Sequence, residues 1–161
     1  MTQLEKIEHL DLQAWVDQAP REQRTFREAV HSVLWAISTS TALRSKMIMK
    51  GGLLMAIRYE SSRFTSDVDF STQQKYSKAA EAELLPELDA QLEAANDALG
   101  YDTMCRRQGT KVTPAKEDGH YQTLQVKIGY AQRSKPAQVE RLRRGQMPNV
   151  VRIDYSYNEA I

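Results

Sequence analysis

Two aspartates, Asp67 and Asp69, form the strongest candidate for a reactive site in this sequence. They belong to the segment Asp67-Val68-Asp69-Phe70, and side chains in a β-strand alternate between its two faces. In a strand, both carboxylates would point the same way, about 7 Å apart, while Val68 and Phe70 would point into the core. Like charges this close repel each other, and a divalent cation between them removes the repulsion. The pair therefore predicts a site for one or two divalent cations; a solvated Asp-x-Asp at a turn is the alternative.

The segment before the acidic pair is typical of a phosphate-binding turn. Residues 47–49 form a short apolar run with the length of a strand, Gly51-Gly52 interrupts it, and residues 53–59 have helical character. Backbone N–H groups at a helix N-terminus favour anions, and glycine lets phosphate oxygens approach the main chain. This order of elements favours a nucleotide-phosphate site beside the cation site.

A third carboxylate, Asp154, lies in a predicted strand over residues 149–157. Four apolar side chains share one face of this segment, and Arg152, Asp154 and Ser156 share the other. Aspartate is unfavourable in a strand rich in β-branched and aromatic residues, and local conflicts of this kind are expected at functional sites. Asp154 is therefore a candidate functional residue; an edge-strand aspartate that faces water is the alternative.

The stretch from residue 50 to residue 70 resembles a known family. A glycine pair, fourteen intervening residues and then Asp-x-Asp are similar to the signature of the polymerase-β-type nucleotidyltransferase superfamily. Within that superfamily, the sequences KGG (50–52), RY (58–59) and RFTSDVDF (63–70) resemble the AbiEii family. Its members are nucleotidyltransferase toxins of bacterial abortive-infection and toxin–antitoxin systems.

The resemblance implies a fold and a domain organisation. We expect an α+β, polymerase-β-like nucleotidyltransferase fold, with a mixed or antiparallel sheet packed by helices. Residues 1–161 would form one nucleotidyltransferase domain, with N-terminal helices in 1–44 and a catalytic core in 45–161. AbiEii-type proteins usually continue into a helical C-terminal half, which we expect to be absent from residues 1–161. The chain is then expected to be either the N-terminal catalytic domain of a longer protein or a shortened family member.

The resemblance also implies roles for individual residues. Asp67, Asp69 and Asp154 would be catalytic and would bind Mg²⁺, a cation that suits hard oxygen ligands, or Mn²⁺ in its place. Lys127 is a candidate catalytic residue, because the family often carries a lysine in its later part. The residues expected to bind the nucleotide are Lys50, Gly51, Gly52, Arg63, Thr65 and Ser66.

These roles imply metal-dependent transfer of a nucleoside monophosphate (NMP) from a nucleoside triphosphate (NTP) to an acceptor. One ion would hold the triphosphate and the other would lower the pKa of the acceptor hydroxyl. RNA, in particular tRNA, is the expected acceptor, and a cognate antitoxin is the expected partner. Two alternatives remain: a non-catalytic module of the same fold that binds nucleotide, RNA or antitoxin, and an enzyme that nucleotidylates a small molecule or a protein.

Charge is unevenly distributed along the chain. Residues 1–100 contain eleven Lys/Arg and fifteen Asp/Glu, a net charge of −4, whereas residues 101–161 contain eleven and six, a net charge of +5. A basic half favours contact with polyphosphate or nucleic acid. A solvated basic surface is the alternative, and charge alone does not separate the two.

Length and composition restrict the class of protein. A chain of 161 residues has room for one domain with a substantial core. It has no apolar run long enough to span a membrane and no signal-peptide pattern. The single cysteine, Cys105, fits a reducing compartment, so we expect a cytoplasmic protein in which this thiol is a strand-core residue rather than a nucleophile.

Two amphipathic helices are predicted from apolar periodicity. Over residues 21–43 the apolar side chains recur at i, i+4, i+7, i+8 and i+11, which predicts a helix that packs on a sheet. A second helix is predicted over residues 77–99, with Pro86 kinking it or breaking it in two and Gly100 ending it.

The C-terminal part is predicted to be mainly β. Strands are expected over residues 101–107 and 121–130, with a polar loop over residues 108–119 between them. Residues 131–147 are rich in Arg, Lys and Gln, which predicts a mobile basic connection with a helical turn at 138–144. This connection would contact nucleic acid or nucleotide, or would be a disordered surface loop.

Overall fold

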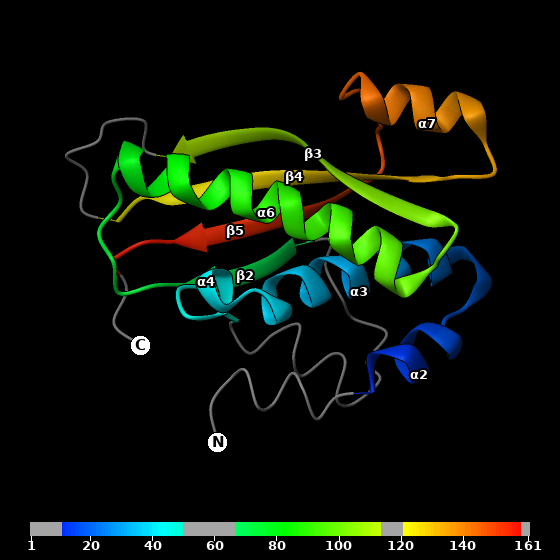
Figure 1. Ribbon diagram of the computed structural model, residues 1–161, viewed down its shortest axis with the longest axis horizontal. Coiled ribbons are helices and arrows are strands. Elements are labelled where there is room, and N and C mark those ends of the chain that lie inside the picture. Colours follow the sequence, from blue (N-terminus) through cyan, green and yellow to red (C-terminus); the bar gives the residue numbers. More distant parts are fainter. Residues whose placement is uncertain (1–10, 50–66, 114–120, 159–161) are drawn as a thin grey trace.

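A single mixed sheet organises the molecule. The computed structural model describes residues 11–49, 67–113 and 121–158. In that part of the chain, five strands have the order β1-β2-β5-β4-β3, and helices pack on the sheet (Figure 1). β2 and β5 are parallel, whereas the other neighbouring pairs are antiparallel. The prediction of an α+β fold with a mixed sheet packed by helices is confirmed.

The strands are β1 (Ile48–Met49), β2 (Asp67–Ser71), β3 (Thr103–Thr113), β4 (Thr123–Gln132) and β5 (Val150–Ser156). The predicted strands at 121–130 and 149–157 are confirmed to within two residues. The predicted loop over residues 108–119 is wrong for 108–113, which continue β3. The sequence Gln108-Gly109 lacks strand propensity, but the backbone of β4 provides hydrogen-bonding partners along its whole length, and one register shift near Gly109 accommodates the irregularity.

The helices are α2 (Leu12–Asp17), the 3₁₀ turn η1 (Arg21–Gln23), α3 (Arg24–Thr39), α4 (Thr41–Arg44), α6 (Lys78–Leu99) and α7 (Pro136–Arg143). The helix predicted over 21–43 is thus divided at Ser40. The Ser40 side chain accepts a hydrogen bond from the N–H of Leu43 (3.2 Å) and donates one to Glu87 of α6 (2.8 Å). Ser40 is therefore the N-cap residue of α4, and α3 ends just before it.

α6 is a continuous helix with defined ends. The Ser77 side chain caps its N-terminus by accepting a hydrogen bond from the N–H of Ala80 (3.0 Å), and Gly100 ends it in the left-handed conformation (φ 67°). Pro86 lies inside the helix at an exposed position. The predicted break at Pro86 is therefore wrong, because a backbone group released on the solvent side can be satisfied by water.

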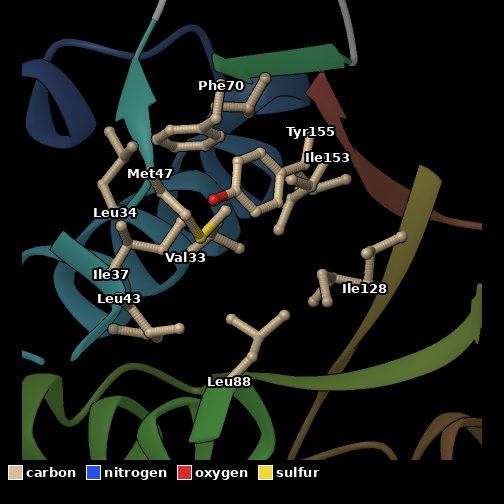
Figure 2. Packing of buried hydrophobic residues seen from close by; sticks show 14 of the residues in the cluster. Val33, Leu34, Ile37, Leu43, Met47, Phe70, Leu88, Ile128, Ile153 and Tyr155 are labelled. Atoms are coloured by element: carbon tan, nitrogen blue, oxygen red, sulfur yellow. The ribbon is translucent and has the colours of Figure 1, made fainter. Parts of the chain in front are cut away.

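α3 and α6 lie side by side over one face of the sheet (Figure 1). Between them and the sheet is the main hydrophobic core, in which α3 contributes the face predicted from its spacing. Figure 2 shows side chains of α3 and α6 meeting side chains of β2, β4 and β5. The fully buried side chains of this core include Leu34, Leu88, Phe70, Ile128, Ile153 and Tyr155. We call this side of the sheet the helix-covered face.

α7 packs on the opposite side of the sheet, at one end of β3 and β4. Leu142 of α7 and Met147 join Ala131 of β4 in a small separate cluster, with Met104 of β3 against it. The helical turn predicted at 138–144 is confirmed and begins two residues earlier. The prediction of a disordered loop is wrong for residues 136–143, because this second cluster fixes the helix on the sheet.

Candidate active site

We call the side of the sheet opposite α3 and α6, apart from the end covered by α7, the polar face. Its hydrophilic side chains form two rows that run across the strands. Residues in register on neighbouring strands point to the same side of a sheet. The first row contains Asp69 of β2, which pairs with Asp154 of β5. It continues through Gln125 of β4 to Lys111 of β3.

The second row lies two residues away along each strand. Asp67 of β2 pairs with Arg152 of β5, Arg152 with Lys127 of β4, and Lys127 with Gly109 of β3. Both rows therefore begin with an aspartate on β2 and become basic or neutral toward β3. The polar face carries negative charge at β2 and positive charge at β4.

The three predicted carboxylates are brought together on the polar face. Asp67 and Asp69 are two residues apart on β2, and Asp154 lies beside Asp69 on the next strand, at the usual strand separation of about 4.8 Å. Asp69 is exposed, whereas Asp67 and Asp154 are half-buried. Both residues lie in β2 rather than at a turn, although the Asp69 side chain is exposed to solvent.

The charges of this group act on one another. Burial raises the pKa of the Asp154 carboxyl above its ordinary value, and the negative charges of Asp67 and Asp69 raise it further. A hydrogen bond from Gln125 and the charge of Arg152 oppose the shift. A cation bound here would favour the ionised form of Asp154.

The carboxylates of Asp67, Asp69 and Asp154 are oxygen donors of the kind that Mg²⁺ prefers. Among residues 11–49, 67–113 and 121–158, no three His, Cys, Asp or Glu side chains are already gathered as a set of metal ligands. Mg²⁺ does not need such a set, because it keeps several waters and is commonly bound through one or two carboxylates together with substrate phosphates. Asp69 and Asp154, on adjacent strands, offer such a pair of oxygen ligands, with Asp67 next along β2.

Lys127 also lies on the polar face, exposed, in the second row. It lines a hollow of about 340 Å³ together with Asp154, Arg152, Gln125 and Lys111. The predicted catalytic lysine and the third carboxylate therefore share one cavity, where a phosphate group could lie between them.

The predicted nucleotide-binding residues, Lys50, Gly51, Gly52, Arg63, Thr65 and Ser66, lie outside the described residues. The same holds for the predicted glycine turn and for the helix expected over 53–59. Their roles stay predictions. The described chain reaches them from Met49 of β1 and continues from them at Asp67 of β2.

Three residues of the polar face received no role from the sequence: Arg152, Gln125 and Lys111. Arg152 and Gln125 could have been found, because alternation within the two predicted strands already placed them on the faces of Asp154 and Lys127. Lys111 could not, since its segment was predicted to be a loop. Cys105 is buried on β3, and burial raises its thiol pKa to about 12, so the prediction of a core residue is confirmed.

An α+β domain with a mixed five-stranded sheet packed by helices is consistent with a nucleotidyltransferase-like fold. A family model, described as the nucleotidyl transferase AbiEii toxin of type IV toxin–antitoxin systems, matches residues 33–161. The chain belongs to the AbiEii family, as the resemblance of residues 50–70 predicted. No curated protein and no solved structure matches the chain. In the described part of the chain, no helix has the length and apolar character needed to cross a membrane.

Proposed function

We propose that this protein transfers an NMP from an NTP to an RNA acceptor, using Mg²⁺ or Mn²⁺ held by Asp67, Asp69 and Asp154. Membership of the AbiEii family supports nucleotidyl transfer and a role in a toxin–antitoxin system, in which a cognate antitoxin would be the partner. The single observation that carries the proposed site is the register of β2 and β5, which puts Asp154 beside Asp69.

In the proposed reaction, the acceptor oxygen bonds to the α-phosphorus of the NTP while the bond from that phosphorus to the pyrophosphate oxygen breaks. Bound Mg²⁺ would neutralise phosphate charge and lower the pKa of the acceptor hydroxyl. Asp67 and Asp69 would bind and orient the ion. Asp154 would complete its ligands or accept the acceptor proton at a carboxylate oxygen, a role that its raised pKa favours.

Cationic residues would hold the phosphates in place. Lys127 lies in the same hollow as Asp154 and would contact a phosphate oxygen of the bound NTP or acceptor. The backbone N–H groups of Gly51 and Gly52 would bind triphosphate oxygens, assisted by Lys50 and Arg63. Thr65 and Ser66 would provide hydroxyl donors close to the first aspartate of the pair.

RNA is the acceptor that the charge of the polar face favours. Lys111, Lys127 and Arg152 are exposed next to the acidic group, and polyanions bind such clusters mainly through their phosphates. A non-catalytic module that binds nucleotide or RNA is the second candidate function. It is favoured by the lack of a ready-made set of three metal ligands among the described side chains.

The test is to incubate the protein with Mg²⁺, total RNA and each labelled NTP in turn. We expect labelled RNA from the wild-type protein and none from Asp69→Ala. Asp97→Ala, which removes an exposed aspartate of α6, is the matched control and should keep full activity. NTP and RNA binding without any labelled product would establish the non-catalytic module, and a labelled small molecule or protein in place of RNA would establish another acceptor.

A further inference from the structure

The polar face continues into a longer depression beyond the acidic residues. The hollow beside Asp154 is joined by a second one of about 450 Å³, and the two share Gly109, Lys127 and Arg152 in their linings. The second hollow reaches residues 145–148, which follow α7. We call the two joined hollows the basic groove. It leads from the third carboxylate toward the α7 end of the sheet.

One side of the basic groove is held in place by Gln108. Its side-chain amide donates a hydrogen bond to the carbonyl of Met147 (2.9 Å) and accepts one from the N–H of Met147 (2.8 Å). Gln108 lies over Gly129, where an added Cβ would come within 2.5 Å of its Cδ. Glycine at 129 therefore makes room for Gln108, and Gln108 fixes the segment that lines the far end of the groove.

The basic groove lies over other strands than the two that flank the predicted triphosphate-binding segment in the sequence. The residues predicted to bind the triphosphate lie between Met49 and Asp67, which belong to β1 and β2 at one edge of the sheet. The basic groove lies over β5, β4 and β3, on the other side of Asp154. In phosphoryl transfer the attacking and leaving oxygens are roughly in line across the phosphorus. If the reacting phosphorus lies at the aspartates of β2, the groove over β5, β4 and β3 is on the side from which an acceptor would approach.

We propose that the basic groove binds the sugar–phosphate backbone of a single-stranded acceptor end. The acceptor hydroxyl would lie at Asp154, and the preceding phosphates would contact Lys127 and Arg152 and then reach residues 145–148. This inference rests on the proposed function and adds to it the path of the acceptor.

The length of the basic groove fits a strand better than a small molecule. From Asp154 to Val150, the four residue steps of β5 cover about 13 Å. Even at the duplex DNA spacing of about 3.4 Å per charge on one strand, which is shorter than that of an extended single strand, this length exceeds one nucleotide. A small acceptor would occupy only the first hollow and would make no use of the second.

Steady-state transfer by Arg152→Gln tests this path. We expect the KM for RNA to rise about tenfold, with the KM for NTP unchanged, because one charge-assisted contact to phosphate is lost. The dependence of log KM on log salt should become shallower by about one unit. Arg152→Lys should recover part of the loss, and Arg44→Gln, which removes an exposed charge of α4, should behave as the wild type. A raised KM for NTP with an unchanged KM for RNA would overturn the inference by assigning the groove to the triphosphate.

Gln108→Ala provides a second, uncharged variant. It keeps every cation of the groove but loses both hydrogen bonds to Met147. We expect a several-fold rise in the KM for RNA and little change in kcat, since the chemistry at Asp154 is untouched. An unchanged KM for RNA, in a variant with the wild-type unfolding temperature, would contradict the proposed role of residues 145–148 in binding RNA.

A binding assay separates this inference from the proposed function. A short fluorescein-labelled single-stranded RNA is titrated with Asp69→Ala and with Asp69→Ala/Arg152→Gln, neither of which is expected to catalyse transfer, and anisotropy is measured. About tenfold weaker binding by the double variant supports the groove even if the wild-type protein transfers nothing, in which case only the proposed reaction fails. Equal binding by the two variants, with an active wild-type enzyme, overturns the groove alone.

Discussion

The two faces of the same sheet differ in what they contribute. On β5, Ile153 and Tyr155 are buried on the helix-covered face, whereas Arg152 and Asp154 alternate with them on the polar face. β2 repeats the pattern, with its aspartates on one side and the buried Phe70 on the other. Along one strand, residues that stabilise the fold therefore alternate with residues proposed to act in the reaction. Substitutions at adjacent positions should affect either stability or activity, but not both.

The largest expected contrast is between Phe70→Ala and Asp69→Ala. Phe70 is fully buried, and truncating a buried phenylalanine costs about 3–5 kcal/mol. Asp69→Ala removes an exposed charge next to two others, so the free energy of unfolding should stay the same or rise slightly. Urea unfolding of both variants, monitored by circular dichroism, measures the contrast. If Asp69→Ala lost as much stability as Phe70→Ala, the division between the two faces would be wrong.

The helix-covered face was predictable because its signal is redundant. The apolar spacing of α3 and the alternation in β4 and β5 recur over several turns or residue pairs, so a single exception does not hide them. The nearness of Asp154 to the pair on β2 was predicted from alternation within strands together with the family resemblance. The register that makes Asp69 the partner of Asp154 depends on long-range pairing and could not be obtained from either strand alone.

The part of the polar face near β3 and α7 was less predictable, because it also depends on contacts between residues far apart in the sequence. Residues 108–113 form a strand that pairs with β4; Thr110, Val112 and Thr113 have strand propensity, but Gln108 and Gly109 before them do not. Leu142 is the one buried residue of α7, so the sequence of this helix has almost no apolar periodicity from which to predict it. Gln108 gained its role through contacts with Met147, which is far away in the sequence.

A smaller effect concerns pH and the helix-covered face. His31 of α3 is buried, its Nδ1 lies 2.8 Å from the hydroxyl of Tyr101, and burial lowers its pKa below the ordinary 6.5, with Asp11 opposing the shift. A base whose pKa is lowered by folding binds more protons in the unfolded state. The free energy of unfolding should therefore fall as the pH falls below about 6.5.

His31→Gln should remove that part of the pH dependence. Urea unfolding of wild type and variant from pH 7.5 to pH 5 isolates the contribution of His31 as the difference between the two curves. The wild-type protein should lose stability relative to His31→Gln as acid is added. A parallel pair of curves would show that His31 titrates alike in the folded and unfolded states.

The smallest effect expected is that of an ion pair on the helix-covered face. Arg107 of β3 forms two hydrogen bonds of 2.8 Å each with Asp89 of α6, and both side chains are partly exposed. Arg107→Gln should cost about 0.5–1 kcal/mol of stability and leave transfer to RNA unchanged. Loss of transfer in this variant would mean that charge on the helix-covered face also contributes to the reaction.

The most direct test of the central claim is the binding of Mn²⁺ by the polar face. Electron paramagnetic resonance of free Mn²⁺, with a non-hydrolysable NTP present, gives the metal affinity of the wild-type protein and of Asp154→Asn. If Asp67, Asp69 and Asp154 hold the cation together, the affinity of the variant should be at least about tenfold weaker, while Asp97→Asn leaves it unchanged. Equal affinity of Asp154→Asn and wild type would contradict the claim that the neighbouring carboxylates of β2 and β5 form one metal site.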